Sequence, residues 1–415
     1  MSTDHNAEND SGQRAGGGAP RHAGPFFDLT EREQRVLRFI TERFIETARP
    51  IGSRSLAREH PEIDLSPASV RNTMSDLEAR GYLDQPHTSA GRMPTERGYR
   101  AFVDELMERP ELAADEKRAV RAVLSQRLSD TGDLLRESSR LLGRLTNLLG
   151  VVLSPRLSTS VLERLELVPL AAGRLMFVLS VRGGFVKTLV LEAEAEGDVR
   201  RHDLGRIVSI LNERLGGLTL EEIRRTFHER TGDLASSATS DPAAGVVRLM
   251  RDEAALLFSE PAEGRLQRGG TQGLMNQPEF REAEDLRALI EMMEDEDRVV
   301  RLLEDVADAS SADATGESEP PADTPASAGN DSSSSEDGLP GGASSQDVQA
   351  LVSIGSEHRE ADAARAAERY SIVTSHFLRG EAVGTIGVLG PTRMDYGRVM
   401  ALVENTARLM NRPGA

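Results

Sequence analysis

The stretch LSPASVRNTMSDLEARG, residues 65–81, carries the best-defined local pattern in the chain. Ser66 is a favourable N-terminal cap, and Pro67 suits the first helical position, where a missing N–H costs nothing. One apolar face recurs at helical spacing: Val70, Met74 and Leu77. Gly81 is typical of the left-handed residue that closes a helix. The pattern therefore predicts a helix that begins at Pro67 and is closed by Gly81.

The face opposite those apolar residues carries short polar side chains and one arginine: Ser69, Arg71, Asn72 and Thr73. A helix lying in the major groove of DNA can offer such groups to base edges and phosphates. A plainer alternative also stands, because similar helices occur in protein-interaction modules and Arg71 could pair with an acidic neighbour. The local pattern favours DNA binding and leaves both interpretations open.

The residues before this helix predict two further helices. Thr30 and Glu33 have the spacing of a capping box, and the apolar face that follows ends at Pro50. Ser53 can then cap a short second helix, which the His-Pro step at residues 60–61 stops. Three helices in this order are typical of a helix-turn-helix unit.

After Gly81 the chain predicts a β-hairpin made of residues 82–85 and 93–95. The loop between them offers hydroxyls and Arg92 to phosphates or to the minor groove. His87 taken alone is more often a surface histidine than a contact. Helices and hairpin together predict a winged helix-turn-helix over residues 29–107. The candidate DNA-binding residues are Arg54, Ser69, Arg71, Asn72, Thr73, His87, Thr88, Ser89 and Arg92.

The rest of the chain alternates between helical and strand patterns. Residues 1–28 lack periodicity and predict a disordered tail, and residues 116–149 predict a helix broken near Gly132. The expected strands are 161–169, 174–181 and 185–191, with a hairpin turn at 182–184, and later 348–354, 370–377 and 382–389. The remaining expected helices are 204–215, 220–231, 243–258, 280–303 and 396–410.

This order predicts an α+β multidomain chain in which one α/β domain is interrupted by a helical insert. Because three strands alone would leave both edges of their sheet exposed, we expect the earlier and later strands to share one sheet. The α/β domain is expected at 108–203, with its linking helix, and at 291–307 and 348–415. The insert is expected at 204–290, and the acidic segment 308–347 is expected to be a disordered insertion.

Charge and composition narrow the possible classes of function. The formal net charge is −18, and half of it comes from the segment 308–347, which has nine acidic residues and no basic one. The predicted DNA-binding unit is nearly balanced, so a binding face there depends on where its charges lie. The absence of cysteine excludes disulfides and thiolate metal sites.

Several common motifs are absent from the sequence. It has no H-E-x-x-H pair, no G-x-x-x-x-G-K-[ST] phosphate loop and no G-x-S-x-G elbow. We therefore expect a protein that is not an enzyme, with no metal and no cofactor. There is also no secretory signal and no apolar run of about 18 residues, which predicts a cytoplasmic protein without a membrane segment.

Several stretches of the chain resemble a known family. RPIGS (49–53), LSPASVRNTM (65–74), HTSAGR (87–92) and PT (94–95) lie in the predicted DNA-binding unit, and GVLGPTRMDY (387–396) lies near the C-terminus. In order and spacing these stretches resemble the heat-inducible transcription repressor HrcA family. The resemblance runs from Leu29 to Met410, and the N-terminal tail and the 308–347 insertion depart from it.

The resemblance implies a winged helix, a GAF-like α/β domain and a dimerisation domain inserted within it. It implies repression of chaperone operons by a homodimer that binds double-stranded DNA at an inverted-repeat operator, the CIRCE element. The GroEL chaperonin is implied as the partner that keeps the repressor active, with release on heat stress.

Two other classes of function stay open. One is a winged-helix regulator whose GAF-like domain binds a small effector, which needs a cavity with a few convergent polar groups. The expected strands supply mostly Val, Leu and Phe, which favours a filled core instead. The other is a pure interaction protein, which would show no operator-specific shift in a gel assay.

The C-terminal stretch also has two interpretations. In the structural one, Gly390-Pro391 makes a turn and either Thr392 or Asp395 caps the last helix. In the functional one, the stretch forms a surface that the chaperonin or the DNA-binding domain contacts.

Overall fold

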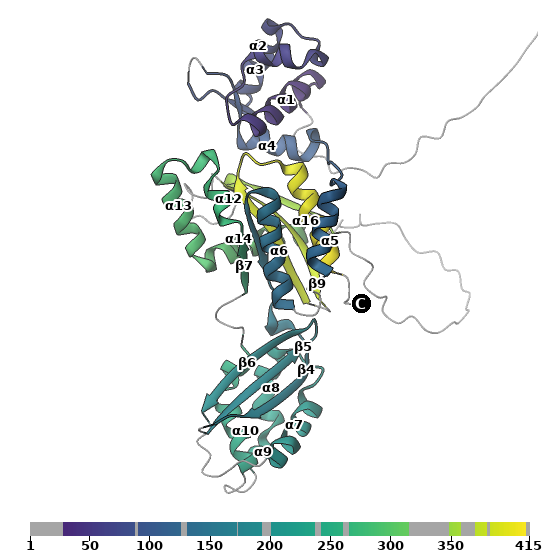
Figure 1. Ribbon diagram of the computed structural model, residues 1–415, viewed down its shortest axis with the longest axis vertical. Helices are drawn as coiled ribbons and strands as arrows, with labels where there is room; N and C mark the ends of the chain where they lie inside the picture. Colours follow the sequence, from purple (N-terminus) through teal and green to yellow (C-terminus); the bar gives the residue numbers. More distant parts are fainter. Residues whose placement is uncertain are drawn as a thin grey trace, which may run out of the picture.

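The computed structural model describes residues 28–87, 90–125, 131–171, 173–192, 201–236, 242–259, 265–314, 348–357, 370–379 and 382–411. These residues form three units along the long axis of an elongated molecule (Figure 1). We name them the N-terminal unit (residues 28–107), the inserted unit (157–259) and the central unit, which comprises the other described residues. The central unit lies between the other two.

The N-terminal unit contains helices and one short hairpin. Its elements are α1 (Glu31–Thr47), α2 (Ser53–Glu59), η1 (Pro61–Ile63), α3 (Pro67–Ala79), β1 (Leu83–Asp84), β2 (Met93–Pro94), α4 (Glu96–Ala101) and η2 (Phe102–Leu106). β1 and β2 pair antiparallel. One buried cluster joins the helices, with Ile40 from α1, Leu56 from α2, and Val70 and Leu77 from α3.

Most of the expected helix ends in this unit are confirmed. Thr30 and Glu33 form the capping box of α1, Ser66 caps α3, and Gly81 has a left-handed φ of 76°. The expected cap of α2 is wrong. Gly52 has the extended backbone of the N-cap and Ser53 is already helical, so the hydroxyl of Ser53 does not cap the helix.

A five-stranded antiparallel sheet in the order β7-β3-β10-β9-β8 forms the centre of the central unit. Its strands are β3 (Leu149–Leu153), β7 (Leu266–Gly269), β8 (Leu351–Ile354), β9 (Tyr370–Arg379) and β10 (Ala382–Pro391). β8, β9 and β10 were expected from the sequence. β3 and β7 were not, because each is too short to show a clear alternation of apolar and polar residues.

Helices cover both faces of this sheet, and the side chains of β9 and β10 are accordingly buried on both alternating faces. α5 (Ala114–Ser125), α6 (Thr131–Thr146) and α16 (Tyr396–Met410) contact one another on one side. α13 (Ala283–Glu294) and α14 (Glu296–Ala314) lie on the other side (Figure 1). Three short elements also belong to the central unit: α12 (Thr271–Met275) and η4 (Pro278–Phe280) follow β7, and η5 (Gly355–Glu357) follows β8.

Glycines allow the backbone of α6 to lie directly against the sheet. A Cβ atom added to Gly150 of β3 would lie 2.1 Å from the carbonyl oxygen of Ser139 in α6. A Cβ atom added to Gly143 of α6 would lie 2.4 Å from the carbonyl oxygen of Gly269 in β7. Both distances are far shorter than a van der Waals contact, so this helix-to-sheet packing excludes any side chain at these positions.

The inserted unit has a sheet of its own. β4 (Leu162–Pro169), β5 (Arg174–Val181) and β6 (Phe185–Glu192) pair antiparallel in that order. Its helices are α7 (Arg201–Leu215), α8 (Leu220–Arg230), α9 (Gly232–Ala235), α10 (Pro242–Asp252) and α11 (Ala254–Leu257). These helices and one face of the sheet enclose a separate core that includes Phe177, Leu211, Phe227 and Phe258.

The expectation that the earlier and later strands share one sheet is therefore wrong. The chain leaves the central sheet after β3 and returns at β7, which pairs with β3 through Gly150 and Gly269. The strands of residues 162–192 belong to the insert with the helices that follow them, so the expected boundary between residues 203 and 204 moves to the end of β3. Three strands suffice here because α7, α8 and α10 give them a core.

The two segments that were expected to be disordered fall largely outside the described residues. Of the tail, only Asp28 is described, and it contacts Arg80. Of the 308–347 insertion, α14 takes in the residues up to Ala314, so the helix runs past the expected boundary.

The glycine contact between α6 and the sheet gives a prediction for stability. Gly150→Ala forces the backbones of β3 and α6 apart, and we expect a loss of about 1–3 kcal/mol, the usual range for overpacking. Gly205→Ala is the control, because Gly205 lies in α7 with no atom within 4 Å of an added Cβ. That change should stabilise helix α7 by up to about 1 kcal/mol. Thermal unfolding followed by circular dichroism measures both, and equal midpoints for the two variants would contradict the prediction.

Candidate nucleic-acid interface

Helix α3 presents one continuous exposed stripe. The side chains that share it recur at intervals of three and four residues: Ala68, Arg71, Asn72, Ser75 and Ala79. The guanidinium of Arg71 has no hydrogen-bond or ion-pair partner among the described residues, so the acidic neighbour considered from the sequence does not engage it. Asp76 is exposed at the edge of the stripe. The side chains at the centre of the stripe are small and polar, apart from the unpaired guanidinium of Arg71.

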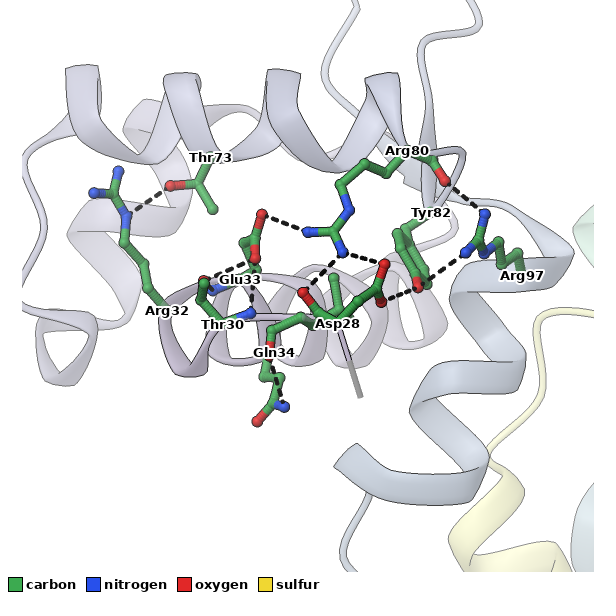
Figure 2. Close-up of polar contacts among 10 residues, drawn as sticks. Asp28, Thr30, Arg32, Glu33, Gln34, Thr73, Arg80, Tyr82 and Arg97 are labelled. Atoms are coloured by element: carbon green, nitrogen blue, oxygen red, sulfur yellow. Dashed lines mark hydrogen bonds and ion pairs between the residues drawn. The ribbon is translucent and has the colours of Figure 1, made fainter. Parts of the chain in front are cut away.

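Two of the residues expected on this face are engaged elsewhere. Thr73 is only 2% exposed, so its expected place on the outer face is wrong. Its hydroxyl accepts a 2.8 Å hydrogen bond from Nε of Arg32 in α1 (Figure 2). The same hydroxyl donates to the carbonyl oxygen of Ser69. Ser69 is half-buried, and the same carbonyl also accepts a hydrogen bond from Arg32. Thr73 follows Val70 by three residues, which turns it toward α1.

Polar contacts at the N-terminal end of α1 hold α3 in place (Figure 2). Arg80, which ends α3, pairs with Asp28 at 2.5 Å and with Glu33 at 3.0 Å. The hydrogen bond from Arg80 lowers the pKa of the Asp28 carboxyl. For Glu33, desolvation is outweighed by hydrogen bonds from Thr30 and Arg80, and its pKa is also lowered. Both carboxylates therefore stay ionised and keep Arg80 bound near neutral pH.

Arg97 extends these contacts to helix α4. Its guanidinium donates to the carbonyl oxygen of Arg80 and to the hydroxyl of Tyr82, and it lies 4.5 Å from the centre of the Tyr82 ring. Tyr82 donates in turn to Asp28. These contacts fix the end of α3 relative to both α1 and α4. Sequence reasoning missed Arg32, Arg80 and Arg97, because their partners are distant in sequence and no local pattern marks them.

The candidate residues of the hairpin differ in how exposed they are. Arg92 pairs with Glu78 of α3 at 2.7 Å and is 18% exposed. Its backbone also exchanges two hydrogen bonds with Ile51. Arg92 therefore anchors the base of the hairpin to α3 rather than standing free at its tip. His87 is exposed, and Thr88 and Ser89 lie outside the described residues.

Arg54 is the remaining candidate. It is exposed on α2, and its guanidinium has no hydrogen-bond or ion-pair partner within the described ranges. The structure thus leaves Arg54, Arg71, Asn72 and His87 accessible on the N-terminal unit. Ser75 is a further accessible polar residue that the sequence could have indicated, because it continues the helical spacing of Arg71 and Asn72.

A cavity of about 400 Å³ lies at the surface between the start of α5 and α16, with Arg109, Lys117 and Arg408 in its lining. Over the described part of the chain, no group of three or more histidine or carboxylate side chains is placed to hold a metal ion. Within the same ranges, no helix is long and apolar enough to cross a bilayer.

Comparison with known proteins assigns the chain to a family. A family model described as the HrcA protein C terminal domain matches residues 132–400. A heat-inducible transcription repressor HrcA from Chlorobaculum parvum is 38% identical over 386 residues, which cover 92% of this chain and 96% of the relative. Its counterpart from Chlorobium phaeobacteroides (strain BS1) is 36% identical over 386 residues, which cover 92% and 97%.

The fold of the chain also resembles that of a solved structure. A crystal structure described as that of a hypothetical protein aligns with a TM-score of 0.56 and 23% identity, covering 93% of this chain and 99% of that one. At this identity the likeness concerns the fold alone. The family model and the long relatives agree over the same residues, so the chain belongs to the HrcA family, in which both relatives are named heat-inducible transcription repressors.

Proposed function

We propose that this protein represses chaperone operons by binding an inverted-repeat CIRCE operator as a homodimer, and that heat releases it. The observation that carries the proposal is the exposed stripe of α3, with Arg71 unpaired among the described residues and Asn72 beside it. In this proposal the N-terminal unit is a winged helix-turn-helix, α3 is its recognition helix and the β1–β2 hairpin is its wing.

The chemistry of the stripe supports base reading. An arginine can pair with the two acceptor atoms of guanine in the major groove, and an asparagine can pair with adenine. Small side chains at Ala68 and Ala79 let the helix approach the groove closely. We propose Arg71 and Asn72 as base contacts, with Arg54, Ser69, His87, Thr88 and Ser89 near phosphates. Arg92 acts by holding the wing against Glu78, and Thr73 by holding α3 against Arg32.

A homodimer is proposed because an inverted repeat needs two binding units related by a two-fold axis. The inserted unit offers a surface for it. One face of its sheet is covered by helices, whereas the other exposes apolar side chains, including Val186 at 57% and Val190 at 44%. Val190 pairs across the sheet with Met176, and Met176 pairs with Val168, so apolar side chains continue across all three strands. Such a patch is typical of a protein interface.

We also propose that the central unit is GAF-like and that the activity of the repressor depends on the GroEL chaperonin. Operator occupancy by a dimer falls when the concentration of folded chain falls. Heat that unfolds part of the repressor, while other unfolded proteins occupy the chaperonin, would then release the operator. The effector-binding alternative has less support, because two cavities of about 400 and 350 Å³ are both open to the surface and the sheet itself is filled by buried side chains.

The proposed base contacts give the second prediction. Arg71→Ala and Asn72→Ala should each weaken binding to a chaperone operator about tenfold to a hundredfold, and relax the preference for one base pair. Arg225→Ala is the control, because Arg225 is exposed on α8, on the helical side of the inserted unit and away from the open face of its sheet. Gel-shift titration at one stated salt concentration measures all three. Unchanged operator affinity in both α3 variants would exclude α3 as the recognition helix.

The proposed dimer surface gives the third prediction. The double change Val186→Glu and Val190→Glu places charges on the open sheet face and should convert the dimer to monomers in analytical ultracentrifugation. Val383→Glu is the control, because Val383 is 53% exposed on β10 of the central unit. A dimer that survives the double change, in a chain with an unaltered circular dichroism spectrum, would rule this face out as the interface.

The heat response gives the fourth prediction. Operator occupancy should fall between a growth and a heat-shock temperature, and added chaperonin should restore part of it. A fluorescence anisotropy assay at the two temperatures, with and without chaperonin, tests this. Equal occupancy in all four conditions would reject both heat release and chaperonin dependence, while leaving the operator-binding proposal intact.

A further inference from the structure

Arg393, in the turn between β10 and α16, joins three segments that are far apart in sequence. Its Nε donates to Glu279 at 2.5 Å and its Nη1 donates to the carbonyl oxygen of Ile45 at 2.5 Å. Its Nη2 reaches Gln277 and Glu279, each at 3.3 Å. The side chain is only 12% exposed. Ile45 belongs to the N-terminal unit, whereas Gln277 and Glu279 belong to the central unit.

At Ile45 the arginine completes the end of α1. The last carbonyl groups of a helix lack partners within it, and a positive charge there is favourable for the helix dipole. Helix α1 has no basic residue in its own last turn. Arg393 supplies both the missing donor and the missing charge from the C-terminal part of the chain.

On the other side, the partners of Arg393 are firmly placed in the central unit. Gln277 donates to the carbonyl oxygen of Asn147, just before β3. Phe280, next to Glu279, stacks on Tyr370 of β9 with ring centres 5.6 Å apart. Arg393 therefore connects the end of α1 to residues that the central sheet holds in position.

A second arginine holds the N-terminal unit at α4. Arg100 donates to Glu357 and, at 2.8 Å, to the carbonyl oxygen of Val352 at β8. Glu96, one turn earlier in α4, accepts a hydrogen bond from Ser356. With attachments at both α1 and α4, the N-terminal unit is held at two places and not by its connecting chain alone.

Helix α1 is a rigid link between Ile45 and α3, so the position of one end determines the position of the other. It has 17 residues and is therefore about 25 Å long at 1.5 Å per residue. Its far end bears Arg32 and Glu33, which hold Thr73 and Arg80 of α3. A tilt of about 10° at the Ile45 end would move the far end by about 4 Å, more than a base-edge hydrogen bond tolerates.

We propose that Arg393 is a positioning residue for operator reading, which fixes α1, and through it α3, in one orientation on the central unit. This inference rests on the proposed function, because it takes α3 as the helix that enters the groove. It assigns a role to the C-terminal GVLGPTRMDY stretch. In a dimer, fixed orientation of both N-terminal units sets the separation and rotation between half-sites that the protein accepts.

Dependence on operator spacing separates positioning from a contribution to stability alone. Each base pair added between half-sites rotates one of them by about 34° about the DNA axis. We expect the unmodified protein to lose about tenfold or more in affinity when the spacer changes by one base pair, and Arg393→Gln to lose only about twofold. The control Arg408→Gln removes an exposed arginine that pairs with Glu404 on α16, and should keep the full spacer dependence.

A distance measurement tests, without DNA, whether Arg393 fixes the orientation of the N-terminal unit on the central unit. The chain has no cysteine, so spin labels attach only at Arg58→Cys in α2 and Arg140→Cys in α6, where the native side chains are 80% and 53% exposed. Labelled chains are diluted with unlabelled chains so that only distances within one chain are seen. We expect one narrow distance distribution in the parent and a broad one with Arg393→Gln. If Arg393→Gln does not fold, Glu279→Gln replaces it in both experiments.

The two readouts separate failure of this inference from failure of the proposed function. A folded variant with an unchanged distance distribution overturns the inference, as does a broad distribution with unaltered spacer dependence. If the unmodified protein binds no inverted repeat, the proposed function fails, and the inference about operator reading fails with it. In that case a narrow parent distribution that broadens in the variant still identifies Arg393 as the residue that fixes the N-terminal unit.

Discussion

The antiparallel pairing of β3 with β10 is the interaction on which the rest of the structure depends. It joins Leu149–Leu153 to the strand of the C-terminal stretch, and β10 pairs in turn with β9. β3 also pairs with β7, so the inserted unit leaves and re-enters the central unit at neighbouring strands. The close contact of Gly150 with α6 then fixes the helices over this sheet. Without the β3–β10 pair, the strands β7 and β3 would be separated from the strands β10, β9 and β8.

Arginine side chains make several of the polar connections between elements that the sheet does not join. Arg80 and Arg92 hold α3, Arg100 and Arg393 hold the N-terminal unit on the central unit, and Arg398 joins α16 to α5 through Glu116. A planar guanidinium can bind a carboxylate and a carbonyl oxygen at once, which an ammonium group does less well. Arginines that are engaged in this way are not available for phosphates, whereas the guanidinium groups of Arg54 and Arg71 are exposed and unpaired among the described residues.

The local signals in the sequence were reliable where one segment satisfied its own requirements. The capping box of α1, the ends of α3 and the turn at Gly183 and Gly184 all depend on neighbouring residues, and all are present. Asp395, one of the two caps considered for the last helix, accepts a hydrogen bond from the backbone of Arg398. The expected turn at Gly390-Pro391 is wrong, because both residues continue β10 opposite β9.

The sequence by itself determined the helices and most strands, because their periodicity, caps and turns are local. It also carried the family resemblance and the exposed positions of Arg71 and Asn72. The tertiary structure decided that β4–β6 form a separate sheet, that Thr73 faces Arg32, that Arg92 is held by Glu78 and that Arg393 caps α1. The physical reason is the same in each case. The partners lie far apart in the chain, so their pairing depends on which surfaces the folded units bring together.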